Sequence, residues 1–446
     1  MTEQNPLFYQ TRKKLPFIER AQGVYMFDHT GKEYIDGSSG AIICNIGYGN
    51  RKVIDRINLQ AEKTFFAYRT HFENRPSADL AEKIVGKLSG GLNKVFYVSG
   101  GSEAVETALK ICRQYFYSRG EGSRHLFISR KPGYHGCTLG ALGITSYAPL
   151  EVPFKPMVKN NPRIPAPFCY RCAYDMQYPQ CGIKCALQLE DTILANGPEN
   201  VAAFVAEPIG GASTAAAVPP DEYFSIIRKI CSKYGIMLIL DEVMTAFGRT
   251  GKFFGYEHFG VKADIIALSK GMASGYFPLG AAVTTREIVD EILDAGGFQH
   301  GHTYAGNPMA CAVGEAVFET IEEQGLVENS AQVGKYIKDG LKQLQVSYRI
   351  IGNVRGKGML TGIELVKDSE GKIPFDPGLN ANFILADMAY ENGLILYPRR
   401  PINGILGDHL LVAPPLITTR DEADIILDRL DGALAKAEKR LFTERM

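Results

Sequence analysis

Five short runs of apolar residues constrain the fold of this chain more than any other feature, because each run is continuous rather than alternating. Continuous apolar runs are typical of strands that are buried on both faces of a sheet. Helix-like stretches separate the runs, and one of them, Asp221–Tyr234, ends at Gly235, a residue suited to a helix C-cap. This alternation predicts an open, mostly parallel α/β sheet. The runs are Val95–Val98, Leu126–Ile128, Val201–Val205, Ile236–Leu240 and Ile265–Leu268.

The texture of the sequence changes after about residue 325, where shorter strand candidates replace the alternation. A helix-like stretch, Ser330–Leu344, comes first, and a charged amphipathic helix, Asp421–Leu441, closes the chain. The strand candidates between them are Gly358–Val366, Leu394–Tyr397 and His409–Val412. We therefore expect a large domain over 71–325 and a smaller α+β domain over 326–446. Residues 1–70, with a hairpin predicted at 24–36, are expected to contribute to the small domain.

The charges give no support to a nucleic-acid or membrane-surface partner. Lys plus Arg and Asp plus Glu each total 49, so the formal net charge is zero, and no block of like charge stands out. The beginning of the chain lacks the apolar core of a signal peptide, and no run approaches the ~18 apolar residues of a membrane helix. We therefore expect a cytoplasmic protein without a nucleic-acid or membrane partner.

Three titratable residues come directly after three of the predicted buried strands. Glu207, Asp241 and Lys270 each stand where such a strand ends. Ligands of open α/β sheets bind outside the carboxyl ends of the strands, so these side chains should meet in one crevice. A glycine-rich turn, Ser99–Glu103, opens a further helix, and free N–H groups at a helix N-terminus attract an anion. A phosphate is the expected occupant of that turn.

Five sequence motifs occur together and in order, and as a set they are specific. With them the chain resembles the class III aminotransferases, which are enzymes of fold type I that depend on pyridoxal 5'-phosphate (PLP). The resemblance runs from about residue 20 to the C-terminus. It implies a large domain with a mostly parallel, seven-stranded sheet and a smaller α+β domain. The motifs are Gly101–Ala108, Tyr134–Gly136, Asp241–Val243, Ser269–Gly271 and Gly301–Pro308.

The resemblance also implies catalytic and phosphate-binding residues. Lys270 would hold PLP as a Schiff base and later move a proton between substrate and cofactor. Asp241 would pair with the pyridine nitrogen and keep it protonated, so that the ring acts as an electron sink. Gly101 and Ser102 would bind the phosphate.

Further residues would surround the cofactor. By resemblance, Tyr134 would stack on the ring with His135 beside it, and Val243 would pack against the opposite face. Glu207 would line the same site. Thr303 would reach the phosphate that a second subunit binds, so a homodimer or a dimer of dimers is expected.

The residues expected to contact substrate depart from common patterns of the family. Members that bind dicarboxylic acceptors often carry an arginine two residues before an Ala-Pro-Pro tripeptide, where this chain has Leu411. Arg399 and Arg400 could bind a carboxylate instead, or could be solvated loop charges. Amine-type members often place a tryptophan near Ile42, so the pocket should admit a longer or bulkier donor. We expect an ω-amine or ω-amino acid donor, with pyruvate rather than 2-oxoglutarate as acceptor.

Several alternatives stay open. The same core motifs would serve a 2-oxoglutarate-dependent aminotransferase, a decarboxylating transaminase or an aminomutase, and a non-catalytic relative could retain the fold. A cysteine-rich stretch has the spacing of zinc or iron–sulfur ligands, although it is not a clean pair of CxxC motifs. We expect reduced, partly buried thiols there and no metal. The stretch contains Cys169, Cys172, Cys181 and Cys185.

Overall fold

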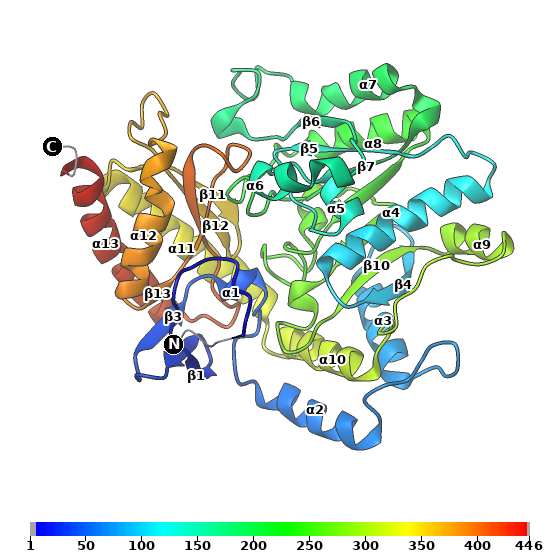
Figure 1. Ribbon diagram of the computed structural model, residues 1–446, viewed down its shortest axis with the longest axis horizontal. Coiled ribbons are helices and arrows are strands. Elements are labelled where there is room, and N and C mark those ends of the chain that lie inside the picture. The colour runs from blue at the N-terminus through cyan, green and yellow to red at the C-terminus, as the bar shows by residue number, and fades with distance from the viewer. Residues whose placement is uncertain (1–5, 444–446) are drawn as a thin grey trace.

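A seven-stranded sheet is the largest element of the fold, as seen in a computed structural model that describes residues 6–443 (Figure 1). The strands lie in the order β4-β10-β9-β8-β7-β5-β6. All neighbours pair in parallel except β10, which runs antiparallel between β4 and β9. The predicted mostly parallel sheet is confirmed. The bounds are β4 (Leu92–Val98), β5 (Leu126–Lys131), β6 (Arg163–Pro165), β7 (Val201–Ala206), β8 (Met237–Asp241), β9 (Ile265–Leu268) and β10 (Gly280–Thr285).

Helices cover both faces of this sheet, which explains why its strands are apolar throughout. In β8, Leu238 and Leu240 pack on one side and Met237 and Ile239 on the other, and none is more than 6% exposed. The first side is covered by α3 (Arg75–Lys87), α7 (Lys184–Asn196), α8 (Tyr223–Tyr234) and α10 (Pro308–Glu323). The second side is covered by α4 (Gly101–Ser118), α5 (Leu139–Ile144) and α9 (Arg286–Asp294), and the short α6 (Ala148–Glu151) follows α5.

The C-terminal part forms a smaller α+β unit beside the large sheet (Figure 1). Its four-stranded antiparallel sheet has the order β11-β12-β15-β14. Three helices pack with this sheet. The bounds are β11 (Ile351–Lys357), β12 (Leu360–Leu365), β14 (Tyr397–Arg399), β15 (Asp408–Val412), α11 (Leu326–Ser347), α12 (Ala381–Glu391) and α13 (Arg420–Thr443).

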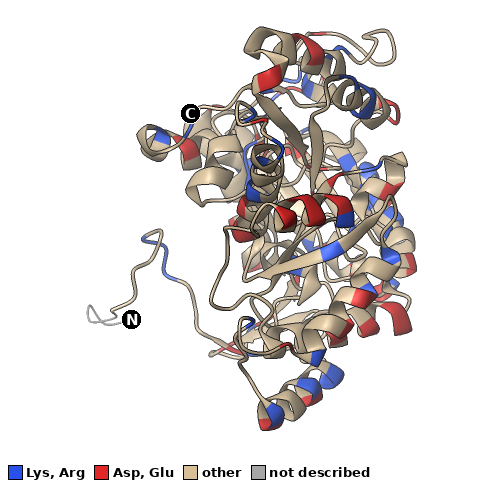
Figure 2. Ribbon diagram, turned by 90° about the vertical axis from the view of Figure 1, so that its right-hand side faces the viewer, with Lys and Arg blue, Asp and Glu red and all other residues tan. Residues whose placement is uncertain are grey.

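The N-terminal segment divides between the two units. The predicted hairpin is present, and its second strand, β3, pairs in parallel with β13 (Leu394–Ile395) of the C-terminal part. Helix α2 instead packs on α10 of the large unit, where Arg56 Nη1 lies 2.6 Å from Glu315 Oε2. Figure 2 shows the charged residues along α2 at the base of the molecule. The bounds are β1 (Ile18–Gln22), β2 (Tyr25–Asp28), β3 (Glu33–Asp36), α1 (Ser39–Ile42) and α2 (Arg51–Lys63).

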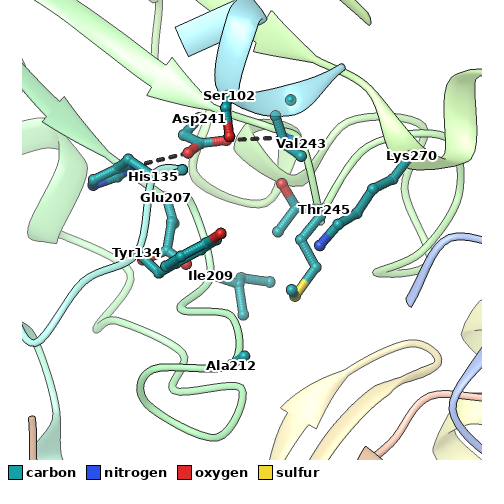
Figure 3. A pocket seen from close by; sticks show the side chains of 13 residues that line it. Ser102, Tyr134, His135, Glu207, Ile209, Ala212, Asp241, Val243, Thr245 and Lys270 are labelled. Atoms are coloured by element: carbon teal, nitrogen blue, oxygen red, sulfur yellow. Dashed lines mark hydrogen bonds and ion pairs between the residues drawn. The ribbon is translucent and has the colours of Figure 1, made fainter. Parts of the chain in front are cut away.

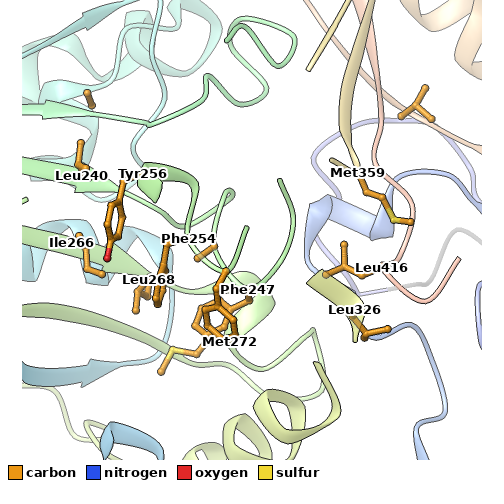
Figure 4. Close-up of a cluster of buried hydrophobic side chains, with 14 of the residues drawn as sticks. Leu240, Phe247, Phe254, Tyr256, Ile266, Leu268, Met272, Leu326, Met359 and Leu416 are labelled. Carbon is orange, nitrogen blue, oxygen red and sulfur yellow. The ribbon is translucent and has the colours of Figure 1, made fainter. Parts of the chain in front are cut away.

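One apolar core continues from the large sheet into the small unit (Figure 4). It includes Leu240 and Leu268 of the sheet, Phe247 of the segment after β8, and Met359 and Leu416 of the C-terminal part. The two units are therefore packed against each other through buried side chains. None of the helices in the described part of the chain combines the length and the apolar character needed to span a membrane.

Candidate active site

The carboxyl edge of the large sheet carries a cavity of about 170 Å³ (Figure 3). Glu207 follows β7, Asp241 ends β8 and Lys270 comes shortly after β9. Parallel strands bring these three side chains together, and all three line the cavity. The remaining lining residues are Gly101, Ser102, Tyr134, His135, Gly136, Ile209, Ala212, Val243, Met244 and Thr245.

A tight turn presents Lys270 to the cavity. The backbone of Lys270 has φ +44°, in the left-handed region that non-glycine residues seldom adopt. The Lys270 carbonyl accepts a hydrogen bond from Ser274 N–H at 3.0 Å, which fixes the turn. Burial lowers the pKa of the Lys270 amine to about 8, although nearby Asp241 and Glu207 favour the charged form. Much of the amine is therefore neutral and nucleophilic at mildly alkaline pH.

Asp241 is fixed through both of its carboxylate oxygens. Its Oδ2 lies 2.8 Å from His135 Nδ1, and its Oδ1 accepts a hydrogen bond from Val243 N–H at 3.0 Å. The side chains of His135 and Asp241 are 0% and 6% exposed. A buried, oriented carboxylate of this kind stabilises a cation or a protonated nitrogen in the cavity.

The first turn of α4 lies at the cavity, where the glycine-rich turn predicts an anion site. Gly100 caps the helix in an extended conformation, so the first N–H groups of α4 are free of helical partners. Ser102 Oγ accepts a hydrogen bond from Cys137 N–H at 3.0 Å, and Ser102 lines the cavity. A Cβ atom on Gly101 would come within 2.8 Å of Val243 Cγ1, so only glycine leaves this wall open.

Tyr134 and Glu207 form another part of the wall. Burial raises the pKa of Tyr134 to about 12, so its phenol stays protonated, and burial also raises the pKa of Glu207. Glu207 Oε1 accepts a hydrogen bond from Gly211 N–H at 2.8 Å, and Arg130 Nη2 lies 3.8 Å from Glu207 Oε2. The carboxylate of Glu207 therefore has partners within the protein.

The four other residues singled out from the sequence do not line this cavity. Ile42 is 1% exposed and belongs to the same apolar cluster as Ile209 of the cavity wall. Thr303 is exposed. Arg399 and Arg400 are described below with their partners. Ile42 does not line this cavity, and its contact with a substrate stays a prediction.

Arg399 and Arg400 have different surroundings although they are adjacent. Arg399 Nη2 donates to the Tyr397 hydroxyl at 2.6 Å, and within residues 6–443 no carboxylate forms an ion pair with Arg399. Arg400 Nη2 donates to Asn380 Oδ1 at 2.6 Å, and Arg400 Nε lies 3.8 Å from Asp408 Oδ1. Arg400 is therefore held within the small unit, whereas Arg399 is available to an incoming anion.

Sequence reasoning missed four residues of the cavity wall. Ile209 and Ala212 lie in the segment after β7, and Met244 and Thr245 lie just after Asp241. Their side chains carry no titratable group, so nothing in the sequence marks them as functional. Their proximity to Glu207 and Asp241 along the chain is the only signal that could have found them.

The cysteine-rich stretch lies away from this cavity. Its four cysteines line a separate small cavity, and all nine cysteines of the chain are free thiols. In the described part of the chain, no group of three or more His, Cys, Asp or Glu side chains is arranged to hold a metal ion. Burial raises the pKa of Cys185 to about 12, so this thiol is protonated at neutral pH.

The chain is similar to known aminotransferases over nearly its whole length. The family model described as Aminotransferase class-III matches residues 9–434. A diaminobutyrate–2-oxoglutarate transaminase from Halomonas elongata is 37% identical, with 96% of this chain and 92% of that protein covered. A putrescine–pyruvate aminotransferase from Pseudomonas aeruginosa is 34% identical, with 92% and 88% covered.

Solved structures agree with this assignment. An amine transaminase from an uncultivated Pseudomonas species, in its PLP-bound form, superimposes with a TM-score of 0.91 at 35% identity. The match covers 98% of this chain and 99% of that one. The family match and this likeness identify the chain as a member of the class III aminotransferases, and hence as a PLP-dependent transaminase of fold type I.

Proposed function

We propose that this enzyme transfers the amino group of an ω-amine or ω-amino acid to pyruvate. The observation that carries the proposal is Leu411, which is fully buried in the same apolar cluster as Ile42 and Ile209, so this cluster offers no cation beside the Ile209 wall of the cavity. A dicarboxylic acceptor needs a second cation, and Leu411 offers an apolar side chain where relatives often have arginine. The named relatives do not decide the acceptor, because one uses pyruvate and the other 2-oxoglutarate.

The residues of the cavity fit PLP. The first turn of α4 with Gly101 and Ser102 would bind the phosphate, and Asp241 would pair with the pyridine nitrogen. Lys270 would attach the cofactor, while Tyr134 and Val243 would enclose the ring. When bound, PLP supplies an electron sink for the charge that develops at the substrate carbon.

The protein's own groups then manage protons and orientation. Asp241, oriented by His135, would keep the pyridine nitrogen protonated. The neutral form of the Lys270 amine, which becomes substantial at mildly alkaline pH because burial lowers the pKa to about 8, would accept the proton that leaves the substrate carbon, and its protonated form would return that proton. The buried walls exclude water from both transfers.

Arg399 is our candidate for the carboxylate of the keto-acid acceptor. Among the described residues, its guanidinium hydrogen-bonds only to the neutral Tyr397 hydroxyl and the Pro398 carbonyl. Burial is the main cause of the lowered pKa of Lys270, and the positive charge of Arg399 contributes weakly in the same direction. Arg400 lacks this freedom because Asp408 and Asn380 hold it.

The acceptor test compares kcat/KM for pyruvate and for 2-oxoglutarate with one good ω-amine donor. We expect pyruvate to be preferred at least tenfold, about 1.4 kcal/mol of transition-state stabilisation. The Arg399→Met variant should lose about tenfold in kcat/KM for pyruvate, whereas the Arg400→Met control should lose less. A tenfold preference for 2-oxoglutarate would overturn the argument from Leu411.

Other reactions of the same cofactor would use the same core residues. A decarboxylating transaminase releases carbon dioxide, and an aminomutase yields an isomer of its substrate without consuming a keto acid. The proposed reaction yields one amino acid for each keto acid consumed and releases no carbon dioxide. Quantifying these products with a single donor decides among the three reactions.

We also propose that the active sites are completed in a homodimer. Thr303 is exposed next to Tyr304, whose ring lies 6.0 Å from that of Phe66. Both rings are exposed, with 62% of Tyr304 and 39% of Phe66 accessible, and Phe72, close to Phe66 along the chain, is 70% accessible. Large exposed apolar patches are typical of protein interfaces. A second copy of the chain at these side chains would let Thr303 reach the phosphate of its neighbour.

A further inference from the structure

A second cavity, of about 400 Å³, lies between the large and the small unit. We call it the interdomain cleft. Its volume is in the range of small-molecule sites. One wall comes from the ends of β5 and β6 and from the start of the cysteine-rich stretch, and the other comes from the loop after Arg400. Its lining residues are Lys131, Pro132, Arg163, Ile164, Pro165, Phe168, Arg171, Ala173, Pro401, Ile402 and Asn403.

The charged residues of the cleft are all cations. Arg163 Nη2 lies 3.2 Å from Glu151 Oε1, and Arg171 pairs with Glu364, so these two charges are partly balanced from outside the cleft. Lys131 is exposed, and no side chain of residues 6–443 forms an ion pair or hydrogen bond with its ammonium group. The remaining walls are mostly apolar. An organic anion with an apolar body would complement this lining.

The interdomain cleft adjoins the catalytic cavity along the chain at two places. Lys131 lines the cleft and Tyr134, three residues later, lines the cavity, so their Cα atoms are at most about 11 Å apart. Pro401 lines the cleft two residues after Arg399, the proposed carboxylate ligand. The two sites therefore lie close enough for one extended molecule to span both.

We propose that the interdomain cleft binds the terminal carboxylate of a long-chain ω-amino acid while the amine of the same molecule occupies the catalytic cavity, with Lys131 as the counter-ion of that carboxylate. The inference rests on the proposed function and narrows its amino donor to long-chain ω-amino acids. A short amine or a short amino acid would leave the cleft empty. The benefit of a terminal carboxylate should therefore grow with the length of the chain.

The test compares ω-amino acids with alkylamines of matched length: 4-aminobutyrate with butylamine, 6-aminohexanoate with hexylamine, and 8-aminooctanoate with octylamine. The quantity measured is the ratio of kcat/KM within each pair, with pyruvate as acceptor. We expect the ratio to rise along the series and to fall about tenfold for 8-aminooctanoate in the Lys131→Met variant. The Lys262→Met variant, which removes an exposed lysine before β9, should keep the wild-type ratio.

Calorimetric binding of octanoate to the PLP-loaded enzyme provides a readout without turnover. The Lys131→Met variant should bind octanoate about tenfold more weakly than the wild type and the Lys262→Met variant. Failure of every ω-amine as a donor would refute the proposed function, while the octanoate measurement would still test the cleft. Equal octanoate affinities in all three proteins would refute the cleft site. If octanoate binds without competing against 8-aminooctanoate, the proposal is also overturned. The cleft would then bind an anion other than the carboxylate of the substrate.

Discussion

His135 and Asp241 form a buried pair in which Nδ1 of the imidazole lies 2.8 Å from Oδ2 of the carboxylate. Because Val243 N–H holds the other carboxylate oxygen at 3.0 Å, neither oxygen can rotate away from the cavity wall. His135 Nε2 is buried and has no hydrogen-bond partner among the described residues. The pair therefore holds the carboxylate in one orientation, and we propose that His135 acts through Asp241.

Replacing Asp241 by asparagine should remove the charge and keep the shape. We expect Asp241→Asn to fold, to bind PLP and to lose at least about 100-fold in kcat, because the pyridine nitrogen loses the anion that keeps it protonated. Circular dichroism and the amount of bound cofactor check the first two expectations, and steady-state kinetics check the third. An Asp241→Asn enzyme with near-normal kcat would contradict the proposed role.

A double-mutant cycle tests whether His135 is a positioning residue. His135→Asn alone should lower kcat by about tenfold. In the Asp241→Asn background the same change should have little further effect, because the carboxylate that His135 orients is gone. Losses that simply multiply would mean that His135 acts independently of Asp241.

The pKa of Lys270 predicts how the stability of the cofactor-free protein varies with pH. Burial lowers this pKa from 10.5 to about 8, so between these two values the unfolded chain binds a proton that the folded chain does not. The contribution of Lys270 to the free energy of unfolding therefore rises with pH across that window, by at most about 3 kcal/mol. Below pH 8 the amine is charged in both states, and burial of that charge then destabilises the folded protein by this full amount.

The measurement is urea unfolding of the cofactor-free wild type and of Lys270→Met at several pH values between about 7 and 10. As pH rises, the unfolding free energy of the wild type should increase relative to that of the Lys270→Met variant. Other groups titrate in the same range, and the variant serves as the control for them. A constant difference would show that Lys270 is not desolvated as the structure implies.

Topology explains why the centre of the site could be predicted from the sequence. Once the buried runs are read as parallel strands, Glu207, Asp241 and Lys270 must meet at one edge, whatever lies between them in the chain. Strand β10 gave no comparable signal, because its first residues, Gly280–Ala282, are small and a short run of small residues has weak strand propensity.

The periphery of the site could not be predicted, because it depends on packing between distant segments. The sequence gives no reason to separate Arg399 from Arg400, yet only Arg400 meets Asp408. Ile42 was expected in the pocket, but it does not line the cavity, whereas Ile209 of the same apolar cluster does. Such distinctions arise from side-chain direction, which a sequence pattern of a loop does not specify.

Arg249 should be among the most important residues for stability. It is fully buried, and its guanidinium donates to the carbonyls of Met359 and Pro414 and to Asn45 Oδ1, at 3.0, 2.6 and 2.8 Å. Arg249→Met would leave these acceptors buried without donors, so we expect a loss of roughly 3–5 kcal/mol in unfolding free energy. The control Arg51→Met removes a side chain that is 77% exposed and should change stability by less than about 0.5 kcal/mol. Denaturant unfolding measures both variants, and similar stabilities would contradict the role of Arg249.

The proposed dimer makes a prediction about which chain supplies Thr303 to each cofactor. Sedimentation should give a dimer at micromolar concentration. The Thr303→Val variant should bind PLP about tenfold more weakly and should still be a dimer. In a mixed dimer of one Lys270→Met chain and one Thr303→Val chain, a site that takes Thr303 from the neighbour would contain both changes, while the other site would contain neither. The mixed dimer should therefore regain half of the wild-type activity at limiting PLP. If Thr303 served the cofactor of its own chain, every site would carry one defect and no site of wild-type affinity would appear.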